Sequence, residues 1–147
     1  MPEPSNGIIQ RMKLKNFTLP FGSQLFKAFS DESRVRILYL LYKNTEMCVS
    51  DMEQVLDFTQ AKTSRHVIYL KNAGLLGFRK IDQWVYYYLK DEFTEIIGQL
   101  FHYLSKDATL QNDSETYRIL YSNRELAINK LHRSRQHMAQ FRLRAIE

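Results

Sequence analysis

The polar side chains with the clearest chemical potential lie together in one short stretch of the sequence. Within seven residues the chain has Gln60, Lys62, Thr63, Ser64, Arg65 and His66. Glutamine can form two hydrogen bonds with adenine, arginine and lysine pair with guanine, and hydroxyl groups reach bases or phosphates. His66 precedes the apolar Val67, so packing or a phosphate contact suits it as well as a base contact does. These residue types favour contact with double-stranded DNA.

The positive charge of the chain is concentrated around the same stretch. The 147 residues have a formal net charge of +5. From Thr59 to Lys90 there are six basic residues and one acidic residue, whereas the rest of the chain has 15 of each sign. Arg79 and Lys80 belong to this segment, and we expect them to contact the DNA backbone. A charged run is often only a solvated surface, so this interpretation depends on the elements that carry the charges.

Two short predicted helices and a tight turn position the polar cluster. Ser50 and Glu53 have the spacing of a capping box at the start of the first helix. Thr59 can cap the second helix, which we expect over Gln60–Ala73 and which Gly74 would end. Two short helices joined in this way, the second of them basic, are typical of a helix-turn-helix.

A β-hairpin is predicted directly after the second helix. Residues 75–81 and 84–89 are rich in strand-forming side chains and flank the polar pair Asp82-Gln83. Such a hairpin next to a helix-turn-helix is a wing. The predicted fold class is therefore mainly α, within α+β: a winged helix-turn-helix with a two-stranded β-wing and a long C-terminal helical extension.

The predicted domain boundaries follow from these elements. Residues 1–21 show little pattern and are interpreted as an N-terminal arm, with a first short helix beginning at Gln24. Residues 22–105 form the winged helix-turn-helix and dimerisation domain. Residues 106–147 form the helical extension, with a polar connection up to Asp113 and a long amphipathic helix from Ser114.

The helix predicted after the hairpin carries a wide apolar stripe. Its members recur at helical spacing and are Phe93, Ile96, Ile97, Leu100, Phe101 and Leu104. A stripe of this width left in water would be strongly unfavourable, so it needs a partner. We expect that partner to be a second copy of the chain, with Leu25 and Phe29 of the first predicted helix in the same interface.

Two runs of the sequence resemble the ArsR/SmtB family of winged-helix repressors. They are KAFSDESRVRILYLL and MCVSDMEQVLDFTQAKTSRHVIYLKNAGLLGFRKIDQWVYYYL, and the resemblance extends roughly over residues 27–104. Members of that family are homodimers that occupy operator DNA and leave it when an effector binds. The resemblance implies a sequence-specific repressor that acts as a homodimer on an inverted repeat.

The metal sites of that family are incomplete in this chain. The family's thiolate site uses a Cys-x-Cys pair, where this chain has Cys48-Val49-Ser50. One thiolate cannot replace the several soft ligands that zinc or an arsenical requires. The second family site begins with Asp-x-His; here Asp91 is followed by Phe93 in place of the histidine. Leu104 and Asp107 stand where that site's later ligands would be. We therefore predict no metal site and no cofactor.

Cys48 leaves one alternative open. A single thiol can be oxidised or persulfidated, so the chain could be a redox-responsive repressor. An inert buried cysteine is the interpretation that we favour.

Several other classes of function are disfavoured. The sequence has no glycine-rich phosphate loop, no H-E-x-x-H and no G-x-S-x-G motif, so we predict that it is not an enzyme. The apolar runs are too short to cross a membrane, no export signal opens the chain, and one cysteine suits a reducing cytoplasm. A winged helix that binds only proteins is the remaining alternative. It would have a neutral or acidic second helix, which Lys62 and Arg65 contradict.

Overall fold

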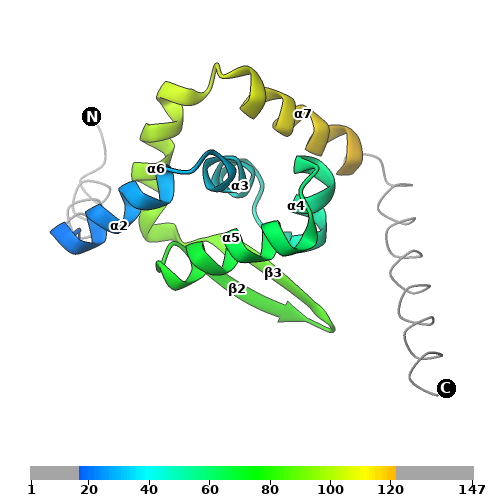
Figure 1. Ribbon diagram of the computed structural model, residues 1–147, viewed down its shortest axis with the longest axis horizontal. Helices are drawn as coiled ribbons and strands as arrows, with labels where there is room; N and C mark the ends of the chain where they lie inside the picture. Colours follow the sequence, from blue (N-terminus) through cyan, green and yellow to red (C-terminus); the bar gives the residue numbers. More distant parts are fainter. Residues whose placement is uncertain (1–16, 122–147) are drawn as a thin grey trace, which may run out of the picture.

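The computed structural model describes residues 17–121, which form a set of packed helices with a small antiparallel sheet on one side (Figure 1). The elements in chain order are α2 (Leu19–Phe29), α3 (Glu32–Lys43), β1 (Met47–Cys48), α4 (Val49–Leu56), α5 (Gln60–Asn72), β2 (Leu76–Ile81), β3 (Trp84–Leu89), α6 (Asp91–Leu104) and α7 (Ala108–Tyr121). α4, α5 and the β2–β3 hairpin are the predicted helix-turn-helix and wing, so the predicted fold class is confirmed. No helix of these residues is long and apolar enough to pass through a membrane.

The predicted ends of α5 are close to the observed ones. The Thr59 hydroxyl accepts a hydrogen bond from the backbone N–H of Lys62 at 3.2 Å, which caps the helix as expected. Gly74, just after the helix, has φ +83°, a left-handed conformation that side chains with a Cβ rarely adopt. A cap and a glycine at these positions fix the length of α5.

The capping box predicted at Ser50 is wrong. α4 begins at Val49, so Ser50 already lies inside its first turn, and no side chain caps the helix. The Ser50 Oγ instead lies 3.1 Å from the Cys48 Sγ. The helix begins earlier because Met47 and Cys48 form β1, which pairs with β3 and leads directly into the first turn.

The wing belongs to a sheet with one strand more than predicted. Among the described residues the strand order is β1-β3-β2, with Phe78 opposite Tyr87 in the hairpin. β1 is only two residues long, too short to show the alternation by which strands are predicted. Gly77 lets the Tyr88 ring pack against β2, because a Cβ at this position would lie 2.4 Å from the Tyr88 Cζ and the ring would have to shift.

The core lies around α3, with α5 on one side and α7 on another (Figure 1). Its apolar side chains are fully or almost fully buried, among them Ile37, Leu38 and Leu40. α6 packs onto α3 through Phe101, whose ring centroid lies 5.1 Å from that of Tyr39 and 5.5 Å from that of Phe29.

Half of the predicted dimer-interface residues are instead buried inside their own chain, which contradicts their assignment to the interface. Four of the eight predicted interface residues are buried in the core of their own chain: Leu25, Phe93, Ile97 and Phe101. The stripe of α6 finds its partner in α2 and α3, which a sequence pattern cannot distinguish from a second copy. Phe29, Ile96 and Leu100 are half-buried and Leu104 is exposed, so their place in an interface stays a prediction.

The first and last described helices begin earlier in the chain than predicted. α2 begins at Leu19 rather than Gln24, because the Thr18 hydroxyl caps it and Pro20 lies in its first turn. α7 begins at Ala108 rather than Ser114, because the Asp107 carboxylate accepts hydrogen bonds from the N–H groups of Thr109 and Leu110. Most of the predicted arm and of the C-terminal extension lies outside the described residues, and the domain division stays a prediction.

Candidate nucleic-acid interface

The turn between α4 and α5 consists of Asp57, Phe58 and Thr59. Asp57 ends α4 in a left-handed conformation with φ 56°, which changes the direction of the chain. The N–H of Phe58 donates to the Glu53 carbonyl at 3.3 Å, and the Phe58 ring is half-buried. This turn places the first turn of α5 at the surface, next to α4.

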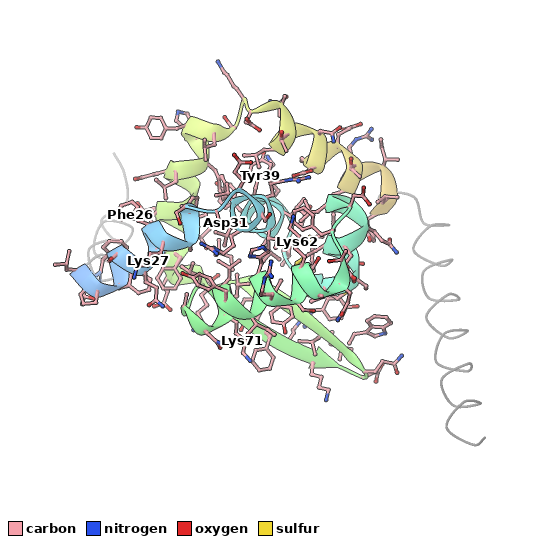
Figure 2. All side chains as sticks on the ribbon, viewed as in Figure 1. Phe26, Lys27, Asp31, Tyr39, Lys62 and Lys71 are labelled. Atoms are coloured by element: carbon pink, nitrogen blue, oxygen red, sulfur yellow. The ribbon has the colours of Figure 1, made fainter. Side chains whose placement is uncertain are left out.

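Four of the predicted DNA-contacting residues on α5 are accessible. Gln60 and Arg65 are exposed, and Lys62 and Ser64 are half-buried. The Gln60 Nε2 donates a hydrogen bond to the Ser64 Oγ at 3.2 Å, which fixes the two side chains relative to each other. Figure 2 shows Lys62 beside α4 and Lys71 near the opposite end of α5, so positive charge is found along the length of the helix.

The predicted DNA contact is withdrawn for Thr63 and His66. Thr63 is fully buried, and its hydroxyl donates to the Thr59 carbonyl at 2.9 Å. His66 is buried as well, and burial lowers its pKa, which favours the neutral form near pH 7. Helical spacing places both residues on the side of Val67 and Leu70, the inner face of α5.

The outer face of α5 extends beyond the residues that were predicted to contact DNA. Ala61, Ile68 and Asn72 lie on the same side as Arg65, at intervals of three or four residues, and all three are exposed. Helical spacing counted in both directions from Val67, which belongs to the inner face, places these positions outward. A small and an apolar side chain can meet the methyl group of thymine, so this face is not limited to polar contacts.

Arg34 connects three helices behind this face. Its guanidinium donates to the Ala28 carbonyl at 3.2 Å and to the Lys27 carbonyl at 2.7 Å, at the end of α2. The Arg34 Cζ lies 4.2 Å from the centroid of the Tyr69 ring on α5. The far half of α5 is thereby held against the junction of α2 and α3.

The two predicted wing contacts have different surroundings. Arg79 forms a bidentate ion pair with Glu46, in which its Nε lies 2.6 Å from the Glu46 Oε2. The hydrogen bonds from Arg79 lower the pKa of Glu46, so that the pair stays ionised. A phosphate would have to compete with this carboxylate for Arg79, whereas Lys80 is exposed at the wing. Lys80 is the stronger candidate for a backbone contact.

The surroundings of Cys48 bear on whether the chain can respond to a metal or an oxidant. Cys48 is buried, and its Sγ lies 3.1 Å from the Ser50 Oγ at the start of α4. Tyr121 of α7 contacts the same helix further along, where its hydroxyl donates to the Gln54 Oε1 at 3.1 Å. Within residues 17–121 no three His, Cys, Asp or Glu side chains come together in a way that could hold a metal ion. The predicted lack of metal sensing still requires measurement.

Comparison with known proteins identifies the family. Residues 31–76, which contain α3, α4 and α5, match the family described as "Bacterial regulatory protein, arsR family". The chain is 38% identical over 81 residues to the cadmium resistance transcriptional regulatory protein CadC of Listeria innocua, a match that covers 55% of this chain and 68% of that protein. The chain belongs to the ArsR family. The resemblance inferred from the sequence is thus confirmed.

A second curated relative and a solved structure are also similar to this chain. The arsenical resistance operon repressor of Escherichia coli is 46% identical over 74 residues, which cover 50% of this chain and 62% of that protein. Among solved structures, HlyU from Vibrio cholerae is 31% identical with a TM-score of 0.55, over 59% of this chain and 95% of that one. As a member of this family the chain is a transcriptional regulator with a DNA-binding winged helix, and the family is not one of enzymes.

Proposed function

We propose that this ArsR-family chain represses transcription as a homodimer bound to an inverted-repeat operator. The observation that carries the proposal is the outer face of α5, where Gln60 and Arg65 are exposed at the start of a helix that follows a tight turn. In helix-turn-helix proteins this part of the second helix contacts base edges in the major groove. The concentration of positive charge between Thr59 and Lys90 supports contact with phosphates on either side.

Selection of bound duplexes from a random library tests this function directly. The enriched sequences are expected to share two half-sites in inverted orientation, about one helical turn apart, because two-fold symmetry places two α5 helices at that spacing. Affinity for the enriched duplex should fall linearly with salt on logarithmic axes, since bound phosphates release counterions. Failure to enrich any duplex, or binding that is insensitive to salt, would contradict the proposal.

The dimer surface that we propose lies along α2 and α6. These helices are neighbours, since the Phe21 and Phe93 rings stack at 4.6 Å. The outer side of α2 carries Phe26, 62% exposed, and a hollow of about 670 Å³ that Gly22 and Phe26 help to line. Exposed apolar side chains beside a hollow are typical of surfaces that associate. The dimer interface that we propose therefore uses exposed residues of α2 and α6 in place of the buried residues of the apolar stripe.

Replacing Phe26 with aspartate is expected to give a folded monomer. A carboxylate placed in an apolar interface loses its hydration without gaining a partner, a cost that weakens association. Light scattering measures the mass, and circular dichroism verifies the fold. Ile119→Asp is the matched control, because Ile119 is also exposed, at 55%, but lies on α7. Dissociation of Ile119→Asp with an intact Phe26→Asp dimer would place the interface on α7.

Cadmium, zinc and arsenite are expected not to release the protein from DNA. Two of the relatives are named for cadmium and arsenical resistance. This sequence, however, has a single cysteine, and it has Ser50 and Phe93 at positions where the family has metal ligands. Too few ligands remain for a metal to bind one conformation more tightly than another, which is what release requires.

Fluorescence anisotropy on the selected duplex measures release, with each metal added and then an oxidant. Release by micromolar cadmium or zinc would refute the expectation. Release by oxidant in the wild type but not in Cys48→Ser would show that the cysteine is a redox sensor rather than a packing residue.

A further inference from the structure

A buried ion pair connects α7 with the centre of the domain. The Asp113 carboxylate on α7 is 1% exposed, and both of its oxygens accept hydrogen bonds from Arg36 on α3, from Nε and from the terminal nitrogen, each at 2.8 Å. The hydrogen bonds that Arg36 donates to Asp113 raise the pKa of Arg36, so the guanidinium stays charged. This planar, two-point contact fixes the orientation of the guanidinium as well as its position.

The oriented guanidinium lies against the turn that precedes α5. The Arg36 Cζ is 5.0 Å from the centroid of the Phe58 ring. The Lys62 Nζ, on the first turn of α5, is 3.9 Å from the same centroid. Two cations of different helices are therefore attracted to one aromatic ring. Asp113, Arg36, Phe58 and Lys62 form a continuous series of contacts from α7 to the helix that meets DNA.

We propose that Arg36 and Asp113 are positioning residues for DNA binding, because their ion pair holds Phe58 and thereby fixes the first turn of α5. This inference rests on the proposed function and assigns α7 a part in it. Neither residue touches DNA in this scheme. Base contacts depend on side-chain placement within a fraction of an ångström, whereas phosphate contacts tolerate small displacements.

A contribution to specificity is more consistent with this pair than one to stability alone. A buried ion pair is weak evidence for stability, because removing two charges from water offsets most of their attraction. Its two-point geometry, however, orients the guanidinium as well as holding it in place. The Glu115–Arg118 pair on α7 offers a matched comparison: it too has a short bidentate geometry, with Nε to Oε2 at 2.9 Å, but both partners are exposed and lie on the same helix.

The test compares Asp113→Asn with Glu115→Gln in the full chain. Two probes are used, the duplex selected by the wild-type protein and a random-sequence duplex of the same length. Asp113→Asn is expected to lose about tenfold in affinity for the selected duplex, within the range of mutations that act through a contact network, with little change for the random duplex. Glu115→Gln should change neither affinity. A merely structural role would lower both affinities of Asp113→Asn together, since it reduces the folded fraction.

A second variant keeps the test decisive if Asp113→Asn folds poorly. Phe58→Leu retains an apolar side chain but removes the ring, so it should lower the ratio of specific to random affinity in the same way, whereas Phe58→Tyr should not. The double variant Asp113→Asn/Phe58→Leu should lose no more than either single variant, because both break the same series of contacts.

Hydrogen exchange separates this inference from the proposed function. Without DNA, backbone amides of α5 should exchange faster in Asp113→Asn and Phe58→Leu than in the wild type or in Glu115→Gln. Wild-type protein that enriches no duplex would refute the proposed function and the positioning role with it. Normal wild-type binding, with unchanged affinity ratios and α5 exchange in both variants, would overturn the positioning role alone.

Discussion

Replacing Lys62 and Arg65 together with alanine is expected to lower affinity for the selected duplex by roughly a hundredfold or more, since each bidentate base contact contributes about 1–3 kcal/mol. Arg65 is exposed on the outer face of α5 and Lys62 lies on its first turn. The variant should remain a folded dimer, because neither side chain belongs to the core. Fluorescence anisotropy measures the affinity. The dependence of the affinity on salt should become shallower, because the variant loses positively charged side chains that contact the DNA.

Two single variants show whether the loss of affinity comes from contact between α5 and DNA or from a general loss of positive charge. Lys106→Ala removes one positive charge, as Arg65→Ala does, but from the turn between α6 and α7, on the far side of the domain from α5 (Figure 1). It should leave affinity almost unchanged. Arg65→Ala alone tests the outer face without disturbing the contact between Lys62 and Phe58. Equal losses for Lys106→Ala and Arg65→Ala would mean that DNA does not meet α5.

Phe101→Ala is expected to lower the free energy of unfolding by about 3–5 kcal/mol, the usual cost of removing a phenyl ring from a core. Phe101 is 1% exposed, and its ring lies among those of Phe29, Tyr39 and Tyr42, with centroid distances of 5.1 to 5.7 Å. Chemical denaturation at one fixed protein concentration measures the loss, because the apparent stability of a dimer depends on concentration.

Tyr103→Ala is the matched control on the same helix. Tyr103 is 84% exposed, so its removal should change the free energy of unfolding by less than about 0.5 kcal/mol. A Phe101→Ala protein that keeps wild-type stability but dissociates would return Phe101 to the dimer interface, where the apolar stripe alone had placed it.

Local signals explain why the helix-turn-helix and the wing could be predicted from the sequence. The cap at Thr59, the left-handed Gly74 and the strand-forming residues around Asp82-Gln83 each act on their immediate neighbours. Such interactions depend on residues three or four apart, so they operate wherever the segment lies in the fold. The concentration of positive charge is likewise a property of the sequence.

The partners of each buried face were decided only by the tertiary structure. Periodicity shows that one side of α6 is buried but not by what, and here the cover is α2 and α3 of the same chain. The same limit applies to α5, where Thr63 and His66 are polar in type but inward in position. Asp113 and Arg36 are 77 residues apart, and no local pattern brings them together. The sequence by itself determined the helices, the turn and the charge; packing determined which side chains remain available to meet DNA, because burial depends on neighbours that lie far away in the chain.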